Sequence, residues 1–267
     1  MSCYGGNMST IAIIQARMGS SRFFGKVLKE ACGKTIIEHI VNRLKYSKKI
    51  DKIVIATSST EKDNVIADFC SLKKISFYRG SEDDVLDRFY QAAKHFGAVE
   101  GDSIVRITGD CPLIDPVIVD EVIRMYMENN SDYGANVNPP TFPDGLDIEV
   151  MKFSLLEKAW NEAKLLSERE HVTLYIRNHP ENFSLSNYVS DIDYSDLRWT
   201  LDEPEDFEVI KIIYENLYSG DRVFLMNDIL RLLNEKKEII EINKKFIRNE
   251  GLEKSLCNDR IVENKKS

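Results

Sequence analysis

The chain has 267 residues, of which 43% are hydrophobic and 30% are charged, a composition typical of a folded protein and too apolar for a disordered one. It carries 36 Lys and Arg residues against 44 Asp and Glu residues, so its net charge is −8 and its pI is near 5.2. This balance disfavours a nucleic-acid partner, although a cationic pocket can exist inside an acidic chain.

The sequence carries no signal for a membrane or a secreted location. No run of 18 apolar residues occurs, which predicts no membrane partner. The first residues lack the basic start of a secretory signal, and residues 1–8 are predicted to be a flexible leader. The five cysteines are odd in number and form no CxxC pair, so we expect free thiols and a cytoplasmic protein. Cys111 is expected to be a small buried packing residue.

The first half of the chain alternates between two patterns. Short apolar, β-branched runs predict strands, and apolar residues at helical spacing predict helices. The strands are expected at residues 9–16, 52–57, 75–78 and 103–108, and the helices at 35–46, 62–70, 81–96 (with Ser81 as N-cap) and 116–129. This alternation predicts an α/β fold with a doubly wound, mostly parallel sheet and helices on both faces. Ligands bind such sheets at the carboxyl ends of the strands.

The second half is less regular. A loop rich in Pro, Asn and Gly is expected at 136–145, strands at 146–150, 184–188 and 197–201, and helices at 153–166 and 204–218. We predict a main domain over residues 9–220 and a charged helical tail over 221–267. The tail could be a lid, a dimer element or a solvated face, and the last two are favoured.

The loop after the first strand is the first chemical signal. Three cations lie within ten residues, between glycines and hydroxyl side chains, and glycines let a backbone approach a ligand closely. Arginine and lysine donate charge-assisted hydrogen bonds to phosphate oxygens. The pattern is neither GxxxxGK[ST] nor GxGxxG, and a solvated basic loop is the alternative. The residues concerned are Arg17, Gly19, Ser20, Ser21, Arg22, Gly25 and Lys26.

Two acidic segments follow other predicted strands. Asp110 follows the strand at 103–108, and Asp202 ends the one at 197–201. Phosphates approach carboxylates through a divalent cation, so Asp110 is a candidate Mg²⁺ ligand. Asp115, which precedes Pro116, is expected to cap the next helix. Glu205 and Asp206 are expected to stabilise a helix N-terminus as first-turn acids.

At these three segments the chain resembles the CMP-sugar synthetases, which are cytidylyltransferases for octulosonate-type and sialic-type acids. Their A-R-x-x-S-x-R-x-x-x-K pattern matches residues 16–26, their G-D-x-P pattern matches 109–112, and their D-x-P-E-D pattern matches 202–206. Further matches at 106–113, 143–150 and 169–173 make the spore coat polysaccharide F-type branch the nearest likeness. The resemblance covers about residues 9–218.

The resemblance implies transfer of CMP from CTP to an acidic sugar-like acceptor, with release of pyrophosphate. It assigns Arg17, Arg22 and Lys26 to the phosphates and Asp110 and Asp202 to Mg²⁺, and it suggests a homodimer built partly from residues 130–190. Further nucleotide contacts are expected from Ala16, Gly19, Ser20, Ser21, Thr57, Arg79, Arg106 and Thr108. Acceptor contacts are expected from Asp144, Asp147, Glu149, Arg169 and His171, with turn, cap or core roles as alternatives.

Departures from the family pattern leave the acceptor open. Phe23 and Phe24 stand where Leu-Pro is common, and Thr200 replaces one acid of a second-metal D-x-D. Two rival functions therefore remain. One is a nucleotidyltransferase that uses another NTP or a phosphonate-type acceptor, and the other is a non-catalytic nucleotide-binding protein.

Overall fold

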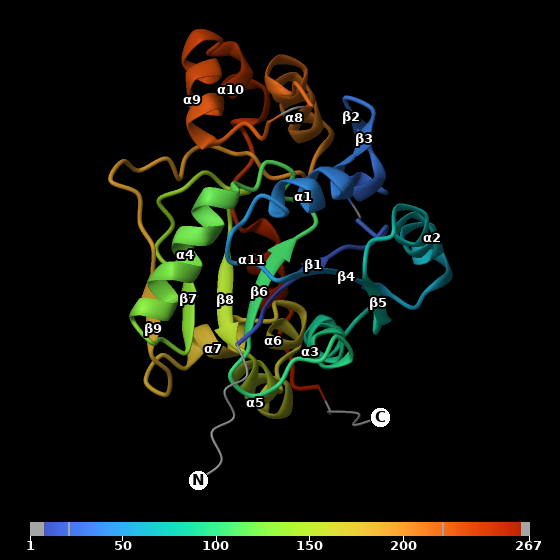
Figure 1. The fold of residues 1–267 in the computed structure, drawn as a ribbon, viewed down its shortest axis with the longest axis vertical. Helices are drawn as coiled ribbons and strands as arrows, with labels where there is room; N and C mark the ends of the chain where they lie inside the picture. Colours follow the sequence, from blue (N-terminus) through green and yellow to red (C-terminus); the bar gives the residue numbers. More distant parts are fainter. Residues whose placement is uncertain (1–7, 21, 221, 263–267) are drawn as a thin grey trace.

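A seven-stranded sheet forms the centre of the protein (Figure 1). The computed structural model describes residues 8–20, 22–220 and 222–262. The predicted leader therefore lies outside the described residues, apart from Met8. In spatial order the strands are β5 (Phe77–Gly80), β4 (Lys52–Ser58), β1 (Thr10–Gln15), β6 (Ser103–Thr108), β8 (Glu149–Lys152), β7 (Tyr133–Ala135) and β9 (Leu185–Asn187).

The sheet is mostly parallel, as predicted. Strand β1 pairs in parallel with β4 and β6, β4 with β5, and β7 with β9, whereas β8 runs antiparallel to both of its neighbours. Side chains of β1 alternate between two cores, since Ala12 and Ile14 pack on one face and Ile11 and Ile13 on the other. A strand buried on both faces accounts for the continuous apolar run in the sequence.

Helices cover both faces of the sheet (Figure 1). One face packs against α1 (Ile36–Leu44), α2 (Asn64–Lys73), α4 (Pro116–Glu128), α8 (Pro204–Leu217), α9 (Met226–Glu235) and α10 (Glu238–Asn243). The other packs against α3 (Val85–His95), α5 (Phe153–Glu162) and α7 (Leu174–Asn178). Short elements complete the described chain: η1 (Lys26–Leu28), η2 (Glu61–Asp63), α6 (Leu166–Glu170) and a hairpin of β2 (Glu30–Ala31) and β3 (Lys34–Thr35).

Some local expectations differ from the structure. Residues 197–201 do not form a strand, because their backbone bonds to loops instead: Trp199 N–H donates to the Asp144 carbonyl and Leu201 N–H to the Asp110 carbonyl. Helix α3 is capped by Asp84 rather than Ser81, whose hydroxyl accepts from the Asp84 N–H. The expected cap at Asp115 is confirmed, since its carboxylate accepts from the first turn of α4.

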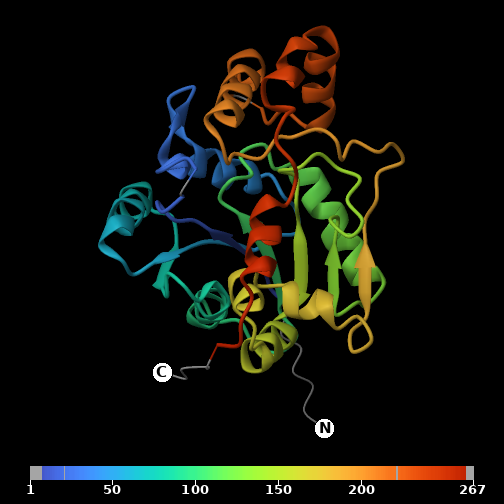
Figure 2. The ribbon, with the colours of Figure 1, turned by 180° about the vertical axis from the view of Figure 1, so that it is seen from behind.

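The segment after residue 220 is more than a solvated face. Phe224, Ile229 and Leu233 are buried in the same core as α8 and the sheet. Beyond α10 the chain turns back, and the last helix, α11 (Glu250–Cys257), crosses the carboxyl side of the sheet (Figure 2). The C-terminal residues therefore reach the edge where ligands are expected.

Candidate active site

A cleft of about 610 Å³ opens at the carboxyl ends of β1 and β6. The loop after β1, the loop after β6 and the 198–202 segment form one side of it. The 144–149 segment, residues 170–177 and the C-terminal segment form the other. The three motifs of the sequence therefore meet here, as the parallel sheet requires.

Asp63 holds the loop after β1 in shape. Its buried carboxylate accepts from the Met18 N–H at 2.7 Å and from the hydroxyl of Ser58 at 2.5 Å, tying the loop to the end of β4. Gly25, at φ +69°, lets the loop fold back so that its N–H donates to the Met18 carbonyl at 3.1 Å. The turn carries Lys26 into the cleft at the start of η1.

Lys26 lies between the two acids that the sequence singled out. Its ammonium is 3.0 Å from Asp110 Oδ2 and 2.7 Å from Asp202 Oδ1. Burial alone would lower the pKa of Lys26, but the two carboxylates outweigh this and raise it. Burial would likewise raise the pKa of Asp110, but the Lys26 ammonium holds it at about 2. Lys26 and Asp110 are therefore both charged at neutral pH.

The two arginines of the loop differ in their partners. Arg22 bonds to Asp202 at 3.0 Å, Glu203 at 3.3 Å and Glu250 at 3.5 Å. Arg17 lines the cleft and makes no hydrogen bond or ion pair to the described part of the chain. This half of the cleft therefore concentrates three cations, of which Arg17 has no charged partner among the described residues.

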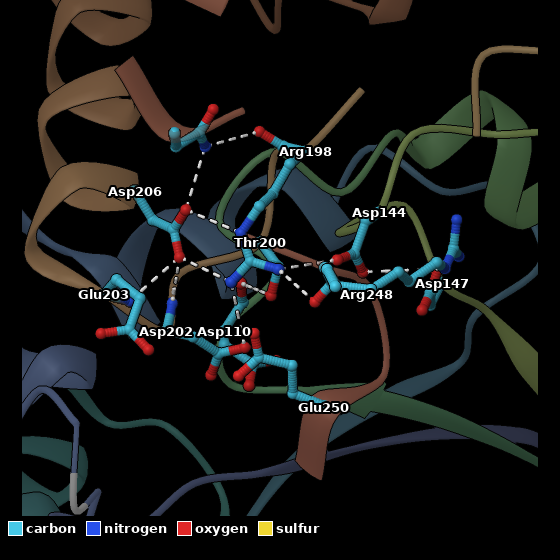
Figure 3. A network of polar contacts seen from close by, with 12 residues as sticks. Asp110, Asp144, Asp147, Arg198, Thr200, Asp202, Glu203, Asp206, Arg248 and Glu250 are labelled. Carbon is cyan, nitrogen blue, oxygen red and sulfur yellow. Dashed lines mark hydrogen bonds and ion pairs between the residues drawn. The ribbon is translucent and has the colours of Figure 1, made fainter. Parts of the chain in front are cut away.

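A second network, built around Arg198 and Asp206, holds the segment that carries Asp202 (Figure 3). Arg198 donates to both oxygens of the fully buried Asp206 at 2.9 Å, and it lies 3.2 Å from Asp144 and 3.6 Å from Asp202. Asp206 also accepts from the backbone N–H groups of Asp202 and Glu203, both at 2.9 Å. The predicted first-turn acid therefore fixes the backbone that carries Asp202.

The other half of the cleft is acidic. Burial, together with the neighbouring Asp147, raises the pKa of Asp144 to about 7, and burial raises that of Asp147 to about 6. Glu149 is paired with Arg106 and accepts from the hydroxyls of Tyr133 and Thr173, both at 2.6 Å. Arg106, an unusual residue for a buried strand, thus lines the cleft while its charge is paired with Glu149.

Most of the predicted site residues line this cleft. They are Ala16, Arg17, Gly19, Ser20, Arg22, Lys26, Arg106, Thr108, Asp110, Asp144, Asp147, Glu149, His171 and Asp202. Ser21 lies outside the described residues.

Three predicted residues do not line it. Arg169 is buried and donates to both carboxylate oxygens of Asp84, the cap of α3, so its charge is used within the fold. Arg79 donates to the carbonyls of Ser58 and Thr60 at 3.0 and 2.9 Å. Thr57 is fully buried, and its hydroxyl has no hydrogen-bond partner in the described chain.

Sequence reasoning missed several residues of the site. Arg177 lines the cleft, and its buried Nε has no hydrogen-bond partner among the described residues. Arg198 and Arg248 hold the acids of the cleft. Only Arg198 had a detectable signal, because it lies in a short apolar stretch four residues before Asp202.

Comparisons with known proteins agree with the geometry. Residues 11–246 match the family model described as Cytidylyltransferase. An uncharacterized protein of Methanocaldococcus jannaschii, MJ1063, is 42% identical over 205 residues, which is 76% of this chain and 82% of that protein. The spore coat polysaccharide biosynthesis protein SpsF of Bacillus subtilis is 36% identical over 234 residues, 85% of this chain and 94% of that protein.

A solved structure points the same way. The structure of a cytidylyltransferase from Leptospira borgpetersenii matches with a TM-score of 0.81 and 34% identity, covering 87% of this chain and 97% of that chain. The likeness inferred from the three motifs is therefore confirmed. By its sequence over residues 11–246 and by its fold, the chain belongs to the cytidylyltransferase family.

Proposed function

We propose that this cytidylyltransferase transfers CMP from CTP to an acidic sugar or a related acceptor, releases pyrophosphate, and serves surface polysaccharide biosynthesis. The observation that carries the proposal is the position of Lys26, whose ammonium lies within 3.0 Å of both Asp110 and Asp202 at the carboxyl edge of the sheet. A nucleotidyl transfer needs cations and metal-binding acids at the same place.

The cationic half is suited to the triphosphate. Arg17 is free to bind phosphate oxygens, and Arg22 can exchange its carboxylate partners for them, because both kinds of group accept forked hydrogen bonds. Lys26 adds a compact charge that is already fixed in place. These residues orient the nucleotide and stabilise negative charge on the departing pyrophosphate.

The acids fit a magnesium ion. Oxygens of Asp110 and Asp202 converge on one cation, the Lys26 ammonium. The described residues hold no group of three or more His, Cys, Asp or Glu side chains that could bind a metal. Two carboxylates are enough for Mg²⁺, which commonly takes its other ligands from substrate phosphates and water. Bound there, Mg²⁺ would polarise the α-phosphate and lower the pKa of the attacking hydroxyl.

The acidic half of the cleft, which we call the acceptor half, is suited to an acidic sugar. Arg177 and His171 lie in the cleft near the acids of the 144–149 segment. Asp144 and Asp147 can accept hydrogen bonds from hydroxyl groups, and the guanidinium of Arg177, which lines the cleft, can donate to a carboxylate. In the reaction an acceptor hydroxyl oxygen forms a bond to the α-phosphorus. The bond between the α-phosphorus and the α–β bridging oxygen breaks, so that pyrophosphate leaves with the electron pair, and the hydroxyl proton passes to solvent.

The proposal also includes the oligomeric state and the cellular location of the enzyme. We expect a homodimer formed partly by residues 130–190, where Val189 is 51% exposed. Light scattering tests whether the protein is a dimer.

No helix among the described residues could span a membrane. The described cysteines are all free thiols, which supports a cytoplasmic location.

The deciding experiment is a screen of pyrophosphate release with each NTP, Mg²⁺ and a panel of acidic sugars and phosphonates. The proposal expects release with CTP and an acidic sugar, and none after removal of the divalent cation. Release with GTP or UTP but never with CTP would refute it. Calorimetric binding of CTP without turnover in any acceptor would favour the non-catalytic alternative.

A further inference from the structure

The C-terminal segment of residues 247–262 follows the part of the chain that matches the family model, which ends at residue 246. It nevertheless forms a wall of the cleft, because residues 247–252, 254 and 255 line it. Figure 2 shows α11, in red, lying across the central strands. A segment in this position is close to any substrate that enters.

The segment is anchored at its far end. Ser167 donates from its N–H and its hydroxyl to the carboxylate of Asp259, at 3.0 and 2.6 Å. The Leu166 N–H donates to the Arg260 carbonyl at 2.9 Å, and the Val262 N–H to the Lys164 carbonyl at 2.8 Å. These bonds tie the end of the chain to α6, so the segment has a defined path over the cleft.

Arg248 enters the acceptor half from this wall (Figure 3). Its guanidinium is paired with the Asp147 carboxylate, donates to the Phe142 carbonyl at 3.0 Å, and has its Nε 3.9 Å from Asp144. Only 14% of the side chain is exposed. Asn249 follows in the left-handed conformation, at φ +66°, and turns the chain into α11 directly after Arg248. A non-glycine residue in that conformation costs free energy, so the surrounding contacts must fix the turn.

Arg248 offsets part of the charge repulsion in this half of the cleft. Besides burial, Asp147 and Asp110 raise the pKa of Asp144, and Glu149 and Asp110 raise that of Asp147, whereas Arg248 lowers both. Arg198 pairs with Asp144, whereas in the described chain Arg248 alone forms an ion pair with Asp147. A planar guanidinium can hold a carboxylate and a carbonyl at once, which an ammonium does less well.

We propose that Arg248 is a positioning residue of the acceptor half: it holds Asp147 and Asp144 in place as hydrogen-bond acceptors for the hydroxyl groups of the acceptor sugar. The C-terminal segment is then part of the active site. This inference rests on the proposed function, since it assigns the acidic half of the cleft to the acceptor.

The test compares Arg248→Ala and Arg248→Lys with Lys245→Ala. Lys245 lies three residues earlier, is 64% exposed and pairs with Glu205 away from the cleft, so its loss removes the same charge without touching the acids. For each protein, KM and kcat are measured for CTP and for the acidic sugar on which the wild type turns over best, for example 3-deoxy-manno-octulosonate or N-acetylneuraminate. The thermal midpoint is measured alongside.

We expect Arg248→Ala to raise the KM for the sugar roughly 10- to 100-fold, as is usual when the partner that orients a ligand-binding group is removed. The KM for CTP should change less than about threefold, Arg248→Lys should recover part of the loss, and Lys245→Ala should match the wild type. An unchanged sugar KM in Arg248→Ala would overturn the inference. So would equal losses for both substrates with a lowered thermal midpoint, which would indicate a structural tie. A wild type that turns over no acidic sugar would overturn the proposed function and the inference together.

Discussion

Replacement of Lys26 by methionine is the sharpest test of the site. Methionine keeps the apolar stem of the side chain and removes the ammonium that lies between Asp110 and Asp202. The half-buried carboxylates then face each other without the cation that offsets their repulsion. We expect the variant to fold but to be less stable than the wild type.

The pKa of Asp110 sets the size of the effect. Burial raises this pKa, but Lys26, the largest of the causes that lower it, brings it from 3.8 to about 2. One pKa unit corresponds to 1.36 kcal/mol, so the net stabilisation of the ionised carboxylate is on the order of 2 kcal/mol. Removing one partner of a buried ion pair commonly costs ~3–5 kcal/mol. We therefore expect a loss of about 3 kcal/mol in the free energy of unfolding at pH 7.

Denaturant unfolding in EDTA at pH 7 measures this loss. Lys29→Met is the control, because the Lys29 side chain is exposed and its ammonium lies over the Phe23 ring, away from the acids of the cleft. Asp110 has a lowered pKa in the fold, so its contribution is complete above pH ~4 and is lost as the pH falls towards 2. The gap between wild type and variant should shrink over that range. Added MgCl₂ should stabilise Lys26→Met more than the wild type, since the vacated position suits a divalent cation. Equal stability of the wild type and Lys26→Met at pH 7 would refute the electrostatic account.

Three further predictions follow from individual residues. Asp110→Asn should lower pyrophosphate release at least about 100-fold. Its circular dichroism should be unchanged, because Lys26 keeps its ion pair with Asp202, and undiminished turnover would show that Asp110 takes no part in the reaction. Gly145→Ala should cost about 1–3 kcal/mol of stability, because Gly145 has φ +105° and an added Cβ would lie 2.5 Å from the backbone around Thr200; thermal melts would detect this, and an unchanged midpoint would contradict it. In native protein treated with iodoacetamide, Cys70 and Cys111 should stay unmodified, since burial raises the pKa of both thiols; mass spectrometry would reveal labelling if the reasoning is wrong.

The fold and the cationic half of the site could be predicted because their signals are local. A strand buried on both faces has an unbroken apolar run in the sequence. The loop that follows a strand of a parallel sheet lies at the carboxyl edge, whatever the positions of the helices. Lys26 and Asp110 were therefore identified from motif position, whereas Asp202, which lies 92 residues after Asp110, was assigned to the site through the family resemblance. The segment at 197–201 was mistaken for a strand because Trp199 and Leu201 are buried in the core, while its backbone hydrogen bonds go to loops rather than to a neighbouring strand.

The acceptor half could not be predicted in the same way. Arg169 and Arg177 lie eight residues apart in a run of short helices, and nothing local distinguishes the one that faces Asp84 from the one that lines the cleft. The charged tail was expected to be a dimer element or a solvated face, and the alternative of a lid was not favoured. Its role depends on where the chain turns after α10, which is set by tertiary contacts such as Asp259 with Ser167.

The acidity of the chain can be reconciled with anionic substrates through the pairing inside the cleft. Five acids that line the cleft each have a cationic partner: Asp110 with Lys26, Asp202 with Lys26 and Arg22, Asp144 with Arg198, Asp147 with Arg248 and Glu149 with Arg106. Cations held by such pairs are already in place, so an incoming triphosphate exchanges one set of oxygens for another and orders few side chains. Under the proposed function, the acids released by that exchange would be available to a divalent cation, so nucleotide and metal binding are expected to favour each other. A net charge of −8 thus reflects the surface as a whole, whereas binding depends on the pairs that can be exchanged.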